Sequence, residues 1–150
     1  MRSRLIFLIA VFALFTRMTN AQTSGLGVGL ILGEPTGISA KKWINSSYSL
    51  NGAAAWSFVD AGALHLHADY VFHNFDLFDP DVGRLAFYYG LGGRLKLTTK
   101  GKLGARVPLG LNYMLDNNPL DLFVEIVPML DLLPATTFTV NAAIGIRYFF

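Results

Sequence analysis

The chain has 150 residues, enough for one domain, and apolar residues make up 53% of it while charged residues make up only 15%. It contains no cysteine, which excludes a disulfide framework and thiol catalysis, and its 12 Lys and Arg against 10 Asp and Glu form no basic patch that would indicate a nucleic-acid partner. Typical globular chains carry roughly 25% charged residues, so the composition is unusual for a soluble domain.

The first predicted element is a cleavable secretory signal peptide over residues 1–21. Met1–Arg4 carries two arginines, Leu5–Phe15 is apolar, and Thr19-Asn20-Ala21 supplies small residues for a cut after position 21. The apolar run is too short for a transmembrane helix, which needs about 20 residues. Cleavage would remove three arginines, so the mature domain, 22–150, would keep nine Lys and Arg against ten Asp and Glu.

The mature chain alternates almost throughout between apolar residues and small or polar ones, a period of two that predicts β-strands. No mature segment offers a transmembrane helix. Because only helices and closed barrels satisfy every backbone group in lipid, the pattern indicates a barrel. Seven connections predict eight strands, and they fall at Glu34-Pro35-Thr36, Asn45–Tyr48, Asp60-Ala61-Gly62, Asp76–Gly83, Thr99-Lys100-Gly101, Asp116–Pro119 and Leu133–Ala135.

The three short connections predict hairpins with three-residue loops. Each loop brings apolar residues of the two strands onto the same face, which a shift by one residue would destroy. The registers pair Leu32 with Ile38, Phe58 with Leu64 and Leu97 with Leu103, and they also place Ser57 opposite His65 and Arg94 opposite Arg106.

Side-chain volume indicates which face points outward. The interior of an eight-stranded barrel is just wide enough to be filled by side chains, so it could not hold this chain's Leu, Phe and Tyr. A soluble barrel would reverse the faces, but its surface would carry far more charge than either face does here. The predicted fold is therefore all-β: an eight-stranded antiparallel up-and-down transmembrane β-barrel in the cell outer membrane.

Lys41 and Lys42 are adjacent, so a regular strand would turn one of them toward lipid, and either a bulge or snorkelling to the rim would relieve the cost. Aromatic residues are expected to form interfacial girdles. The residues assigned to these girdles are Trp43, Trp56, Tyr89, Tyr113 and Tyr148.

The inner face carries most of the strand charges and predicts a buried polar network that plugs the lumen, since uncompensated buried charge is costly. Glu125 is the expected partner of the two facing arginines, with Asp69 on the other side near Arg94. The residues of the predicted network are His65, His67, Asp69, Arg94, Lys96, Arg106, Glu125, Asp131 and Arg147.

Two sets of residues on this face also have the chemistry of a metal site or of an enzyme. His65 and His67, at i and i+2 with Asp69 beyond them, have spacing that can bind zinc or copper, but polar filling of the lumen is the favoured interpretation. A Ser57–His65 pair would suit a lipid A-modifying barrel enzyme, yet both residues face inward. The sequence thus predicts no catalytic residue, no metal site and no cofactor.

The final strand ends Gly145-Ile146-Arg147-Tyr148-Phe149-Phe150, which resembles the C-terminal insertion signal of bacterial outer-membrane barrels. That resemblance implies that the barrel-assembly machinery contacts Ile146, Tyr148 and Phe150. The whole mature chain resembles eight-stranded barrels like the OmpA transmembrane domain. Three motifs resemble, more narrowly, a family of small outer-membrane barrels best known from spirochaetes: Gly33-Glu34-Pro35-Thr36-Gly37, Lys41-Lys42-Trp43 and His65-Leu66-His67-Ala68-Asp69-Tyr70.

The function expected from these observations is a structural or surface-interaction role in the outer membrane, with a plugged lumen and outer-membrane lipids as partners. A narrow pore or ligand-binding transport barrel is the first alternative, and a lipid A-modifying enzyme the second. A surface or periplasmic protein partner is left open. With the N-terminus periplasmic, strand parity places the Asp76–Gly83 connection on the periplasmic side and leaves only short loops outside.

Overall fold

The computed structural model describes residues 25–58 and 62–150. The expected signal peptide and the centre of the 60–62 turn lie outside these residues. None of the described segments forms a helix long and apolar enough to cross a membrane.

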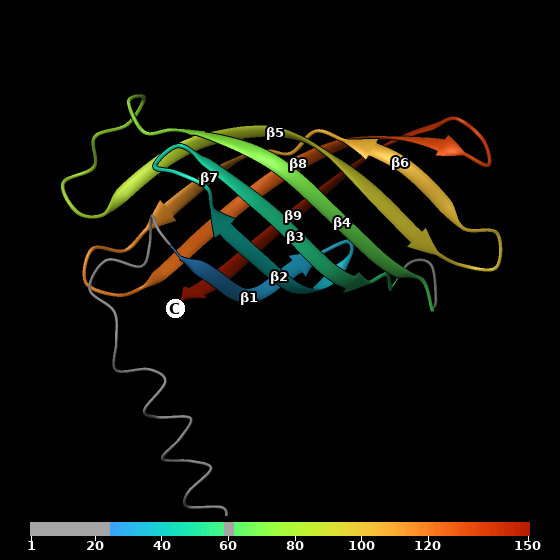
Figure 1. Cartoon of the computed structure of the whole chain (residues 1–150), viewed down its shortest axis with the longest axis horizontal. Helices are drawn as coiled ribbons and strands as arrows, with labels where there is room; N and C mark the ends of the chain where they lie inside the picture. Colours follow the sequence, from blue (N-terminus) through green and yellow to red (C-terminus); the bar gives the residue numbers. More distant parts are fainter. Residues whose placement is uncertain (1–24, 59–61) are drawn as a thin grey trace, which may run out of the picture.

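Within the described residues the chain forms nine antiparallel strands, coloured from blue to red in Figure 1. Their bounds are β1 Leu26–Gly33, β2 Thr36–Trp43, β3 Tyr48–Trp56, β4 Leu64–Asn74, β5 Arg84–Leu97, β6 Lys102–Arg106, β7 Leu109–Met114, β8 Leu120–Leu133 and β9 Thr137–Phe149.

The strand pairings run around a ring of eight strands. Successive strands pair with one another, and β9 pairs with β1 from Gly27↔Phe149 to Gly33↔Ala143. β6 and β7 occupy a single place in the ring, because both pair with β5 on one side and with β8 on the other. The predicted antiparallel up-and-down order of eight strands is therefore confirmed, with one strand interrupted.

The interruption lies at Val107 and Pro108, between β6 and β7. Proline lacks the N–H that a strand donates to its ladder. Its carbonyl still accepts from the Gly90 N–H at 3.0 Å, and the Val107 N–H still donates to the Pro128 carbonyl at 2.9 Å. The register continues unchanged across the break, so the strand changes its local bonding without changing its neighbours.

The predicted hairpin registers are wrong by two residues in all three cases. The structure pairs Leu30, not Leu32, with Ile38; Trp56, not Phe58, with Leu64; and Leu95, not Leu97, with Leu103. The last residues that pair in each hairpin are Ile31 with Gly37, Trp56 with Leu64, and Lys96 with Lys102, so more than three residues separate the paired positions. Arg94 consequently lies opposite Gly104 rather than Arg106, and His65 lies opposite Ala55 rather than Ser57.

A shift of two residues keeps every side chain on its predicted face. In β8, for example, burial alternates strictly from Asp121 to Val127, with the odd positions buried and the even positions exposed. This confirms the predicted separation of an apolar outer series from a smaller, more polar inner series.

The connections fall at the two ends of the ring (Figure 1). The C-terminus lies at the same end as the longest connection, residues 75–83, and the connections 44–47 and 115–119. The opposite end carries the short hairpin loops. This agrees with the strand parity that the sequence predicts.

Candidate functional site

The outer face of the described strands is almost entirely apolar. Lys42 is the one charged residue in its outward series, and the remaining polar positions, Thr36 and Asn74, lie at strand ends. Large apolar side chains of the kind that soluble proteins usually bury are 37–66% exposed on these strands. On the strands they include Leu30, Leu32, Ile38, Leu50, Leu91, Leu122, Val124, Ile126, Val140, Ile144 and Ile146.

The two adjacent lysines of β2 take opposite faces without a bulge. Lys41 is 1% exposed and points into the ring, whereas Lys42 is exposed and lies one residue before the end of the strand. The charge that reaches the outer face thus sits near the edge of that face.

Aromatic side chains gather on the outer face at the end of the ring that carries the C-terminus. Tyr48 lies 5.4 Å from Tyr70 and 5.1 Å from Phe72, between ring centroids, and Phe72 lies 5.4 Å from Tyr89. Trp56 marks the other end and is 52% exposed.

The assignment of Trp43 to an outer girdle is wrong. Its side chain follows Lys41 on the inner face of β2, is 5% exposed, and packs with Met114 and Phe149. The Lys41 ammonium lies 4.1 Å from the centre of the Trp43 ring. Trp43 therefore helps to fill the mouth of the lumen.

The interior at this end holds a first charged group in which two cations share one carboxylate. Asp121 lies 3.4 Å from the Lys41 ammonium and accepts bonds from Arg147 Nε at 2.9 Å and Nη2 at 3.2 Å. Lys41 also donates to Asn112 Oδ1 at 2.6 Å and lies 2.9 Å from His73 Nε2. The side chains of Lys41 and Asp121 have no exposed surface.

A second group lies next along the interior, and in it two carboxylates share one cation. Arg106 Nε approaches Asp69 Oδ1 at 3.0 Å, as an ion pair without hydrogen-bond geometry, and Nη2 donates to Glu125 Oε1 at 3.3 Å. The Tyr88 hydroxyl donates to Glu125 Oε2 at 2.8 Å. The ring of Tyr88 lies 5.4 Å from that of His73, so the two groups adjoin and their excess charges are of opposite sign.

A third group lies toward the end that carries the short loops. Arg94 donates from Nε and Nη2 to the two oxygens of Asp131, at 2.8 and 2.6 Å. Asp131 also lies 3.9 Å from the half-buried Lys102 ammonium. Lys96 and His65 are buried nearby on the inner face, at 6% and 7% exposure.

All nine residues of the predicted lumen network point inward, but the structure groups them differently from the expectation. Arg94 pairs with Asp131, while Asp69 and Glu125 both serve Arg106. Five further participants lie outside the predicted set. These are Lys41, His73, Tyr88, Asn112 and Asp121, and the alternation of their strands already placed all but Lys41 on the inner face.

The residues considered for chemistry are engaged elsewhere. Ser57 donates its hydroxyl to Glu34, whose other carboxylate oxygen accepts from the Phe58 N–H at 3.4 Å. Glu34 thereby links two neighbouring hairpins. His67 Nε2 lies 3.9 Å from Asp69. Among the described residues, no three His, Asp or Glu side chains come together as a metal site.

An antiparallel ring with a charged interior and an apolar exterior places the chain in the class of β-barrel folds. The structure is similar to the crystal structure of the N-terminal β-barrel domain of OprF from Pseudomonas aeruginosa, with a TM-score of 0.63 and 15% sequence identity. The match covers 87% of this chain and 100% of the OprF domain. No protein-family model and no curated protein sequence matches the chain.

Proposed function

We propose that the mature chain is an integral outer-membrane β-barrel with a structural or surface-interaction role and no enzymatic activity. The observation that carries the proposal is the composition of the outer face. If this barrel were soluble, it would expose apolar side chains to water over its whole outer surface. In a membrane, the same side chains would contact lipid. The aromatic group and Lys42 at one edge match the chemistry of a membrane–water interface.

The proposed lumen is closed by its own side chains. Supporting this, Lys41 of β2 and Asn112 of β7 make contact although their strands lie four places apart in the ring of eight. Trp43, Met114 and Phe149 pack together at the mouth next to them. Such contacts leave the side chains of Lys41 and Asp121 in the first charged group without exposed surface.

Partners of two kinds follow from the proposal. Outer-membrane lipids would contact the apolar outer face, and the barrel-assembly machinery would contact the outward face of the last strand at Ile146, Tyr148 and Phe150. The similarity to the OprF domain supports a barrel fold for such an assembly route. The narrower resemblance to the spirochaete barrels remains a prediction that rests on its three motifs.

Cell fractionation followed by gel electrophoresis of unboiled samples tests the proposal. The full chain should appear in the outer membrane as a band that shifts on boiling, because a folded barrel resists detergent until it is heated. A matched chain lacking residues 2–21 should stay in the cytoplasm. A soluble periplasmic protein with no boiling-dependent shift would contradict the proposal.

Planar-bilayer recordings distinguish a closed lumen from a narrow pore. The reconstituted chain should give no stable conductance, since side chains from opposite strands meet across the interior. Reproducible single-channel steps would favour the transport alternative.

Mass spectrometry of lipid A with and without expression tests the enzyme alternative, which predicts a change in acyl chains.

A further inference from the structure

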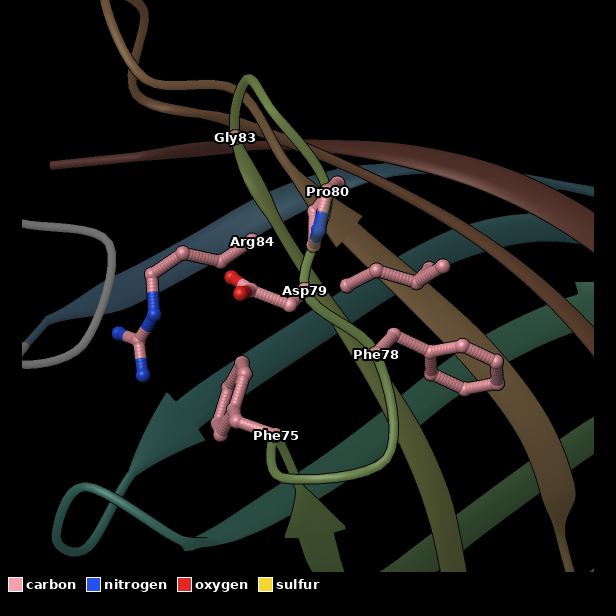
Figure 2. Close-up of a pocket in the computed structure, with 7 residues that line it drawn as sticks. Phe75, Phe78, Asp79, Pro80, Gly83 and Arg84 are labelled. Atoms are coloured by element: carbon pink, nitrogen blue, oxygen red, sulfur yellow. The ribbon is translucent and has the colours of Figure 1, made fainter.

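A hollow of about 250 Å³ lies at the end of the ring that carries the C-terminus, against the connection between β4 and β5 (Figure 2). Phe75, Phe78 and Pro80 line it with apolar surface, and Asp79 and Arg84 contribute opposite charges. The hollow adjoins the mouth of the interior, where Phe75 packs against Trp43 and its ring lies 6.3 Å from that of His73, but it shares no residue with the three charged groups.

The connection that forms the hollow is held at both of its ends. The Asp76 N–H donates to Asn74 Oδ1 at 2.9 Å, and the Gly83 N–H donates to Asp116 Oδ2 at 2.8 Å. Gly83 has a φ of +76°, and a Cβ there would lie 2.6 Å from the Tyr113 hydroxyl oxygen. Only glycine meets both conditions, so the path of the connection at this end of the hollow depends on Gly83.

Neither charge of the hollow has an ion-pair partner among the described residues. Arg84 places its guanidinium over the Phe75 ring, 4.0 Å from the centroid, rather than on a carboxylate. Asp79 extends its carboxylate into the hollow on the side of Arg84, but the two side chains form no ion pair (Figure 2). A cation and an anion that line one cavity without pairing suit a ligand that carries both charges.

The position of the hollow indicates where such a ligand comes from. Leu85 lines it and belongs to the outward series of β5, where it pairs with Tyr113. Phe78, 41% exposed, adds apolar surface beside it. The hollow therefore borders the aromatic edge of the outer face, which is the level at which lipid headgroups meet a membrane protein.

We infer that this hollow binds the headgroup of a zwitterionic membrane lipid that carries a phosphate and a primary ammonium, as phosphatidylethanolamine does. Arg84 would hold the phosphate, Asp79 the ammonium, and Phe78 and Leu85 the start of the acyl chains. The inference rests on the proposed function, because it requires the outer face to lie in a bilayer.

Native mass spectrometry of the full chain, folded in detergent with equal amounts of phosphatidylethanolamine and phosphatidylglycerol, tests the site. The wild type should retain the ethanolamine lipid in preference. Asp79→Asn should lower the ratio of the two lipids about two- to five-fold, the range of exposed charge pairs, because phosphatidylglycerol offers no ammonium. Arg84→Gln should lower the retention of both lipids by a similar factor.

Two variants control for charge alone. Asp81→Asn removes the same charge from the same connection outside the hollow, and Lys42→Gln removes a cation at the same end of the ring; both should retain lipid like the wild type. An unchanged ratio in Asp79→Asn, or an equal fall in Asp81→Asn, would overturn the inference.

Two further results would separate the possible failures. If the wild type retains free O-phosphoethanolamine as strongly as it retains the intact lipid, the inference that the ligand is a lipid is overturned. If the wild type inserts into vesicles but shows no lipid preference, the inference alone fails. If it does not insert into vesicles at all, the proposed function fails together with the inference.

Discussion

The ammonium of Lys41 and the side-chain oxygen of Asn112 meet at 2.6 Å, although β2 and β7 lie on opposite sides of the ring. The contact shows how narrow the interior is, because one lysine and one asparagine span it. It also brings Lys41 next to the carboxylate that Arg147 uses, so two cations depend on Asp121.

Asp121→Asn should therefore be strongly destabilising. The substitution leaves Lys41 and Arg147 buried without a counter-charge, and breaking a buried pair in this way typically costs about 3–5 kcal/mol. Urea unfolding of the barrel refolded in lipid vesicles measures the free energy. A loss below about 1 kcal/mol would show that water or another acceptor already compensates these cations.

Lys41→Met should cost much less, because Asp121 keeps its two bonds from Arg147. Combining it with Asp121→Asn removes one of the two orphaned cations, so the double variant should be more stable than the sum of the single effects by about 0.5–3 kcal/mol. Strict additivity in the same urea measurement would mean that Lys41 and Asp121 do not interact.

Gly145→Val should destabilise the barrel by about 1–3 kcal/mol, the usual cost of overpacking. A Cβ at Gly145 would lie 2.2 Å from the ring of Phe123, which pairs with Gly145 in β8. The guanidinium carbon of Arg147 lies 4.1 Å from the centroid of the same ring. The same Cβ would lie 2.6 Å from the backbone oxygen of Leu30, which cannot move aside as a side chain can.

Gly93→Val is the matched control, since Gly93 also lies within a strand but on the outer face. The nearest atom to a Cβ there is the Gly104 carbonyl oxygen at 3.8 Å. This variant should unfold within about 0.5 kcal/mol of the wild type, as substitutions away from packed features do. Equal losses at both glycines would indicate a backbone effect rather than a clash with Phe123.

The sequence was sufficient to predict the faces of the strands but not their registers. Burial fixes the parity of each strand, so a one-residue error would have turned Leu30 and Ile38 inward. A two-residue error leaves the alternation of faces unchanged, so Leu32 fits opposite Ile38 as well as Leu30 does. The loop conformation decides between them, and it depends on contacts such as those of the Thr36 hydroxyl with the Gly33 backbone.

The interior partners could not be predicted for a related reason. Arg94 bonds to Asp131 two places away in the ring, so its partner depends on the registers of two ladders and on the length of the arginine side chain. Pattern alone identified which residues are inside. The sequence left open whether a bulge accommodates the lysine pair of β2, and the unbroken pairing of β2 with β1 from Lys42 to Gly37 shows that the strand is regular there.

A lysine in the centre of the outer face should separate a membrane barrel from a soluble one. Ile126 lies in the middle of β8 and is 55% exposed. In a bilayer, Ile126→Lys should cost about 2–4 kcal/mol, whereas removing the charge at the edge with Lys42→Leu should change stability by no more than about 1 kcal/mol. Urea titrations in vesicles provide both values, and a neutral Ile126→Lys would contradict a lipid-facing surface.

The outward face of the last strand should matter for assembly more than for stability. Phe150 is 43% exposed and packs edge-on against Tyr148, with ring centroids 5.1 Å apart, so Phe150→Ala removes a contact surface while leaving the ladder intact. In cells this variant should reach the outer membrane more slowly, as pulse-labelling followed by unboiled electrophoresis would show. Its unassisted refolding into vesicles should match that of the wild type.

Phe138→Ala, which removes an exposed aromatic from the other end of the same strand, should assemble normally. A slow Phe138→Ala, or a normal Phe150→Ala, would mean that the assembly machinery does not recognise the C-terminal residues.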